Sequence, residues 1–172
     1  FVSAMKNEFG DSSVNTTLCD NVYQGMSATG TSSVAEAAIS DVKKYESTWQ
    51  SDYNDAAVVV FARNGSEGND VYQYSADDTY SDGSARRMMD LSTNEQALIE
   101  YLSAQKKAGV FKSIVVVIAS EFQMELGFLD EYDIDACLLT GMTGSYGCEA
   151  IAQVLDGTVN PSGRTVDTYA SN

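Results

Sequence analysis

One glutamate, in a short loop behind an apolar segment, is the residue of this chain best placed to do chemistry. The apolar segment covers residues 56–62, and the loop after it reads Arg63-Asn-Gly-Ser-Glu-Gly-Asn-Asp70. The valine-rich segment predicts a strand buried on both faces, and Gly65 and Gly68 allow sharp changes of direction around Glu67. Ligands of open α/β sheets bind beyond the carboxyl ends of the strands, where this loop would lie. Glu67 is therefore a candidate catalytic acid, although a solvated loop acid fits the same pattern.

Hydrolysis of a glycosidic bond is the chemistry that such an acid would suit. The reaction needs two carboxyl groups, one to protonate the leaving oxygen and one to act as nucleophile or to activate water. A general acid must keep its proton near neutral pH, and the surplus of acids in this chain shifts carboxyl pKa values in that direction. The sequence singles out no second carboxylate for Glu67. We interpret Asp77, Asp78 and Asp82 as solvated loop acids.

A second candidate site is the glycine-containing turn Gly141-Met-Thr-Gly-Ser-Tyr-Gly147. It follows an expected strand and begins an expected helix, which is the position of phosphate-binding loops. Its spacing matches neither common phosphate-loop pattern, and no lysine follows to neutralise a phosphate. A tight strand-to-helix turn with close backbone packing explains the glycines equally well. Ser145 has no histidine or adjacent lysine to activate it as a nucleophile.

The composition of the chain excludes several classes of function. Its 172 residues include 25 acidic, 10 basic and no histidine residues, which gives a formal net charge of −15. This charge disfavours nucleic acids and anionic lipids and favours neutral or cationic partners such as sugars. Without histidine the chain can build neither a Ser-His-Asp nor a Cys-His site. Cys19, Cys137 and Cys148 form no metal-binding or disulfide pattern, so we expect no metal and no cofactor.

Alternating helical and extended segments are expected to position Glu67. We expect helices over residues 1–9, 33–50, 92–109 and 144–156, and strands over 13–18, 56–62, 113–119 and 136–140. The polar region 71–90 shows no sustained period and is expected to be a long loop. No apolar stretch is long enough to span a membrane. The order of elements predicts one α/β domain, a doubly wound and mostly parallel sheet with helices on both faces.

Three motifs of the chain stand in a recognisable order. They are the Arg63–Asp70 loop, the helix start Leu91-Ser-Thr-Asn-Glu-Gln-Ala-Leu-Ile99, and the ending Leu155-Asp-Gly-Thr-Val-Asn-Pro-Ser-Gly-Arg164. Together they resemble the C-terminal α/β-sandwich domain of glycoside hydrolase family 3. The Asn-Pro-Ser-Gly-Arg ending is the most specific of the three. The resemblance predicts that residues 1–172 are one such domain.

This resemblance implies half of an active site. In the β-glucosidase branch of the family the matching loop carries the acid/base glutamate, which falls on Glu67, and we expect Asp70 and Arg63 to bind substrate. Family members pair the sandwich with a (β/α)8 barrel, which supplies the aspartate nucleophile and most of the sugar pocket and which we do not find in this chain. The implied function is the sandwich domain of a retaining, β-glucosidase-like β-glycosidase that hydrolyses O-glycosyl bonds in carbohydrates. Alone, the chain is expected to be inactive.

Departures from the family pattern leave alternatives open. Val71 stands where the family usually has arginine, and the turn at Gly144-Ser145 differs from the usual one. The strand that normally precedes the Phe1 helix is not found, which would leave a sheet edge exposed. A non-catalytic carbohydrate-pocket or domain-interface module is one alternative, and a nucleotide- or phosphate-binding α/β domain is another. The start at Phe1 suggests a piece of a longer protein, for which an extracellular or cell-surface location is favoured over the cytoplasm.

Overall fold

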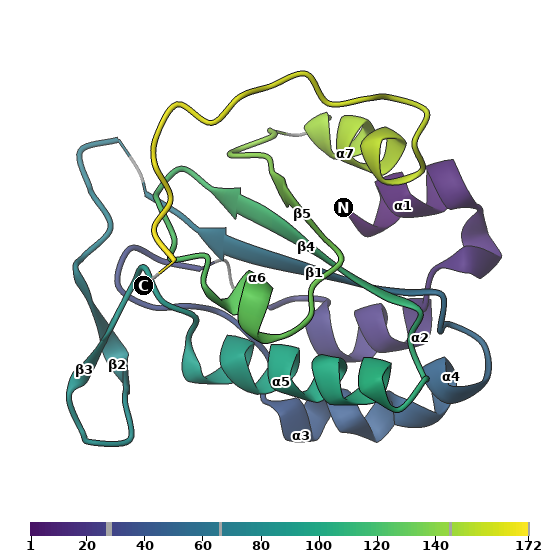
Figure 1. Ribbon diagram of the computed structural model, residues 1–172, viewed down its shortest axis with the longest axis horizontal. Coiled ribbons are helices and arrows are strands. Elements are labelled where there is room, and N and C mark those ends of the chain that lie inside the picture. Colours follow the sequence, from purple (N-terminus) through teal and green to yellow (C-terminus); the bar gives the residue numbers. More distant parts are fainter. Residues whose placement is uncertain (27–28, 66, 145, 172) are drawn as a thin grey trace.

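The computed structural model describes residues 1–26, 29–65, 67–144 and 146–171 of the chain (Figure 1). The strands are β1 (Ala56–Arg63), β2 (Tyr74–Thr79), β3 (Ala85–Arg87), β4 (Ser113–Ser120) and β5 (Ala136–Leu139). The α-helices are α1 (Val2–Phe9), α2 (Thr16–Leu18), α3 (Ile39–Val42), α4 (Glu46–Ser51), α5 (Thr93–Lys107), α6 (Phe128–Glu131) and α7 (Gly147–Leu155). Short segments of other helical geometry are η1 (Asp11–Ser13), η2 (Cys19–Tyr23) and η3 (Lys43–Tyr45).

The central sheet is parallel and has the strand order β1-β4-β5. β1 and β4 pair along their whole length, from Ala56 opposite Ser113 to Arg63 opposite Ser120. Because both strands stop at the same level, the loops that follow them leave the sheet side by side. β1 is an outer strand, and no described segment pairs with its outer edge.

Helices cover both faces of this sheet. Figure 1 shows α3, α4 and α5 on one side and α1 and α7 on the other. On the α5 side, Phe61, Ile114 and Ile99 are at most 1% exposed and form the centre of the core. Full burial of each such side chain stabilises the fold by roughly 1.5–3 kcal/mol. The predicted α/β sandwich with helices on both faces is confirmed.

Helix α5 begins at a capping box formed by Ser92 and Glu95. The Ser92 hydroxyl accepts a hydrogen bond from the Glu95 amide at 3.2 Å, and the Glu95 carboxylate accepts one from the Ser92 amide at 2.8 Å. The helix ends at Lys107, two residues before the predicted stop at Gly109. In the described part of the chain, no helix is long and apolar enough to cross a lipid bilayer.

Two predictions for the first third of the chain are wrong. The strand predicted over 13–18 is instead a series of short helical turns. The Asn15 side chain favours the turn Thr16–Leu18 by accepting a hydrogen bond from the Leu18 amide at 3.1 Å. The helix predicted over 33–50 begins only at Ile39. The residues that precede this helix lie beside the polar region 71–90 instead. There the Thr31 carbonyl accepts a hydrogen bond from the Tyr72 amide at 2.8 Å.

The polar region 71–90 contains an antiparallel hairpin of β2 and β3 rather than the predicted loop. Tyr74 pairs with Arg87, and Thr79 pairs with Ala85. Most of its side chains are exposed or half-buried on both faces, so the sequence carries no alternation of apolar and polar residues. Asp78 fixes the hairpin to the start of α5 by accepting hydrogen bonds from the amide and hydroxyl of Thr93 at 2.7 and 2.6 Å.

Candidate functional site

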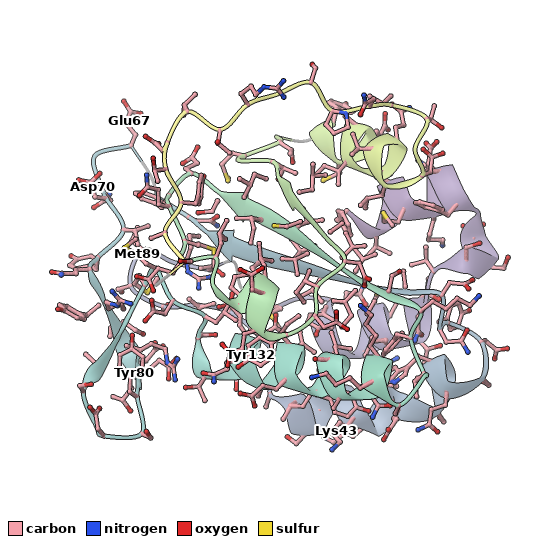
Figure 2. The ribbon with its side chains drawn as sticks, in the orientation of Figure 1. Lys43, Glu67, Asp70, Tyr80, Met89 and Tyr132 are labelled. Atoms are coloured by element: carbon pink, nitrogen blue, oxygen red, sulfur yellow. The ribbon has the colours of Figure 1, made fainter. Side chains whose placement is uncertain are left out.

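Glu67 and Asp70 lie on the loop between β1 and β2. Both residues are exposed, and Figure 2 shows them at the outer rim of the molecule, beyond the carboxyl end of β1. Glu67 lines neither of the described cavities. The carboxyl group is therefore accessible to a ligand held by a neighbouring surface. The roles of Glu67 in catalysis and of Asp70 in substrate binding stay predictions.

The two glycines of the Glu67 loop are required for different reasons. Gly68 has a φ angle of +77°, which favours glycine. Gly65 does not have a positive φ. A Cβ atom at Gly65 would instead lie 2.7 Å from the Phe122 ring and 3.5 Å from the Asn69 carbonyl oxygen. The loop therefore closes tightly at its base, with Glu67 between Gly65 and Asn69.

Arg63, the last residue of β1, has no exposed surface. Its Nη1 and Nη2 atoms each lie 2.8 Å from one carboxylate oxygen of Glu95. The Nε, Nη1 and Nη2 atoms also donate to the carbonyl oxygens of Met88, Ala62 and Asp90, each at 2.7 Å. These bonds use every N–H group of the guanidinium. Arg63 thus fixes the end of β1, and its predicted contact with substrate stays a prediction without geometric support.

The Arg63–Glu95 ion pair was not predictable from local sequence patterns. The local sequence explains the contact of Glu95 with the N-cap Ser92, but its ion-pair partner Arg63 is 32 residues earlier in the chain. The available signal was an arginine at the end of a buried strand, where a charged side chain needs a partner. Because Glu95 is 1% exposed, loss of Arg63 would leave a buried charge unpaired.

Glu36 is a partly buried acid close to the Arg63–Glu95 ion pair. Burial, helped by the negative charge of Glu95, raises the pKa of Glu36 to about 7 against the opposing effect of hydrogen bonds from the Ala37 amide and the Tyr23 hydroxyl. The Glu36 carbonyl accepts a hydrogen bond from the side chain of Asn94 at 2.9 Å. Glu36 therefore titrates near neutral pH at the contact between the 31–38 segment and α5.

A pocket of about 300 Å³ lies between the hairpin and the start of α5. Asp77 and Asp78 line it. Asp77 is exposed, as predicted, whereas the side chain of Asp78 is only 21% exposed and forms an ion pair with Arg86. Burial raises the pKa of Asp78, but hydrogen bonds from Thr93 and the charge of Arg86 outweigh burial and lower it. Asp78 is thus a structural acid, and the prediction that it is solvated is wrong.

Backbone geometry accounts for the described glycines between β5 and α7. Gly141 and Gly144 have φ angles of +58° and +61°, and a Cβ atom at Gly147 would lie 2.6 Å from the Cβ of Thr143. These are the properties of a tight strand-to-helix turn, the simpler of the two interpretations. Ser145 lies outside the described residues.

The fold and the exposed Glu67 define a class of protein: an α/β sandwich whose accessible carboxyl group lies just beyond an outer strand of a parallel sheet. The sequence model of the glycosyl hydrolase family 3 C-terminal domain matches residues 3–172. The chain belongs to this family. No curated protein sequence matches it. C-terminal domains of the family normally accompany an N-terminal barrel domain, which gives this chain a glycosidase context.

Proposed function

We propose that this chain is the sandwich domain of a retaining, β-glucosidase-like β-glycosidase, and that Glu67 is its acid/base. The observation that carries the proposal is the position of Glu67, exposed at the tip of a tightly closed loop beyond the carboxyl end of β1. A carboxyl group so placed can enter a sugar pocket that another domain forms. Membership of a glycoside hydrolase family supplies the reaction class.

The proposed reaction divides its two carboxyl groups between two domains. In the first step, the Glu67 carboxyl group protonates the leaving oxygen while an aspartate of the barrel attacks the anomeric carbon. In the second step, the Glu67 carboxylate removes a proton from the water that cleaves the glycosyl-enzyme bond. The nucleophile comes from the barrel, so the isolated chain has no turnover of its own.

Substitution Glu67→Gln in the full-length parent enzyme tests the assignment. Protonation matters most when the leaving group is a poor one, so hydrolysis of alkyl glycosides and oligosaccharides should fall by about 10²- to 10⁴-fold. The first step with activated aryl glycosides should change much less. Glu121→Gln is the matched control, because Glu121 is an exposed acid on the loop after β4. Unchanged turnover of poor substrates in Glu67→Gln would contradict the assignment.

A non-catalytic module that only shapes a sugar pocket or a domain interface is the second candidate. The position of Glu67 outside both described cavities favours this alternative. It predicts that Glu67→Gln changes KM but leaves kcat and its dependence on the leaving group unaltered. The kinetic experiment above therefore distinguishes the two candidates.

A further inference from the structure

An aromatic ring from the loop after β4 closely approaches the base of the Glu67 loop. The Cε2 and Cζ atoms of Phe122 lie 2.7 Å from the place where a Cβ atom at Gly65 would be. Real Cβ contacts are almost never this short, so a side chain at residue 65 would fit only if the Phe122 ring moved away from the base of the loop. Gly65 and Phe122 follow neighbouring parallel strands, β1 and β4. The contact joins two loops at the carboxyl edge of the sheet.

Phe122 is itself held in place by the buried hydroxyl of Ser120. The hydroxyl donates a hydrogen bond to the Phe122 carbonyl at 2.7 Å and accepts one from the Phe122 amide at 3.0 Å. Ser120 is 8% exposed and stands opposite Arg63 in the sheet register. The chain is thus bent directly after β4, which fixes the backbone from which the ring reaches Gly65.

The Glu67 loop is anchored at two points, Arg63 and Gly65, on the β1 side of the acid. Arg63 is fixed by its bonds to Glu95 and to three carbonyl oxygens. Two residues later, the Phe122 ring lies against Gly65, whose Cβ position is also 3.5 Å from the Asn69 carbonyl oxygen. A shift of this base would move the tip that carries Glu67, and a displacement of about 1 Å at a reacting group can cost about 10²-fold in rate.

We propose that Phe122 is a positioning residue for Glu67, which acts by holding the base of the acid/base loop through its contact with Gly65. The proposal rests on the proposed role of Glu67. Phe122 touches neither substrate nor the reacting atoms in this proposal. Phe122 differs from Arg63, which also anchors the loop, because Phe122 belongs to the loop after β4. It therefore makes the orientation of Glu67 depend on a second strand of the sheet.

Hydrogen exchange of the chain tests the contact without relying on catalysis. Phe122→Ala should speed amide hydrogen exchange at residues 64–65 and 67–70 by about tenfold or more, because the base of the loop opens locally. Exchange at Leu98 and Ile99 in α5 should stay unchanged. Gln123→Ala, at the exposed neighbouring position, is the matched control. Unchanged exchange in the loop, or an equal increase throughout the sheet and α5, would overturn the proposal.

A double substitution in the full-length parent tests whether Phe122 acts through Gly65. Gly65→Ala alone should lower kcat for substrates with poor leaving groups, because its methyl group displaces the Phe122 ring from the base of the loop. Adding Phe122→Ala to Gly65→Ala should cost little further activity, because both substitutions break the same contact. Phe122→Leu, which keeps apolar bulk without the ring, provides a second variant if Phe122→Ala folds poorly. Additive losses in the double variant would overturn the proposal.

The kinetic readout separates positioning from a merely structural role. Phe122→Ala should lower kcat for poor leaving groups about tenfold with KM unchanged, while activated aryl glycosides respond less. An equal loss on both kinds of substrate would overturn the positioning role. If Glu67→Gln shows no dependence on the leaving group, the proposed function fails and this proposal fails with it. If Glu67→Gln behaves as expected but the Gly65 and Phe122 effects are additive, only the positioning proposal fails.

Discussion

Arg63 places a charged group inside the protein at the end of the strand that carries the Glu67 loop. Its guanidinium is fully buried against the Glu95 carboxylate and three carbonyl oxygens, in bonds of 2.7–2.8 Å. Desolvation makes such a pair weak as a source of net stability, but removal of one partner leaves an uncompensated charge. The pair thus makes the structure around β1 and α5 sensitive to single substitutions.

Arg63→Met should destabilise the chain by about 3–5 kcal/mol, because Glu95 then stays buried without a cation. Urea unfolding of the isolated chain measures the free energy of unfolding. Arg164→Met, at an exposed arginine near the end of the chain, is the control and should change it by less than about 0.5 kcal/mol. A similarly small effect of Arg63→Met would contradict the structural role of the ion pair.

Glu36 should make stability fall as pH rises from about 4.5 to about 7. Its pKa in the folded chain is about 7, above the ordinary value of 4.5, so in this range the folded state holds a proton that the unfolded state has released. Glu36→Gln cannot titrate. Its free energy of unfolding should equal that of the parent chain below pH 4.5 and exceed it by roughly 1–3 kcal/mol above pH 7.

Thermal or urea unfolding at several pH values measures this difference. Glu149→Gln, at an exposed acid of α7, is the control and should show a difference that does not vary with pH. A difference between Glu36→Gln and the parent chain that stays constant from pH 4 to pH 8 would show that burial and the Glu95 charge do not raise the pKa of Glu36.

At the scale of elements, the hairpin of β2 and β3 depends on its attachment to α5. Asp78 accepts two hydrogen bonds from Thr93 and forms an ion pair with Arg86. Asp78→Ala should lower the free energy of unfolding by about 1–2 kcal/mol and increase exchange of the hairpin amides. Asp77→Ala, at the exposed neighbouring acid, should have little effect. Equal effects of the two substitutions would contradict the attachment.

Elements with a clear pattern of apolar residues were predictable from the sequence, and elements without such a pattern were not. β1, β4 and β5 follow apolar runs, and α5 begins at a capping box that local chemistry specifies. The hairpin escaped prediction because neither of its faces is packed into the core. The partners of Arg63 and the contact of Phe122 with Gly65 leave no local signal for another reason, because each contact joins residues that are far apart in the sequence.

At the scale of the whole molecule, the last segment returns to the side of the sheet that carries the Glu67 loop. Residues 156–168 are exposed, and Figure 1 shows this segment, in yellow, passing from α7 towards the loop before α6. There the Ala170 carbonyl accepts a hydrogen bond from the Leu126 amide at 2.8 Å, and the Ser171 carbonyl occupies the space beside Gly127. The Asn160–Arg164 motif, which predicted the family from the sequence, thus lies in the exposed part of this segment.

The division of the active site between domains makes a prediction for the isolated chain. The barrel supplies the nucleophile in this proposal, so the 172-residue chain should not hydrolyse aryl β-glucosides. Measurable turnover by the purified chain, abolished by Glu67→Gln, would place a second catalytic carboxylate within it. That result would contradict the shared site while keeping Glu67 as a catalytic residue.

The most direct measurement of the central claim is product analysis of Glu67→Ala in the full-length parent with an activated aryl β-glucoside and azide. Without Glu67 no base activates water, so the glycosyl-enzyme should accumulate. Azide needs no proton removed, and its attack on the anomeric carbon displaces the aspartate carboxylate. We expect azide to accelerate turnover and to give the β-glycosyl azide, with retained configuration. No acceleration, or an α-glycosyl azide from direct displacement, would contradict the assignment of Glu67 as the acid/base.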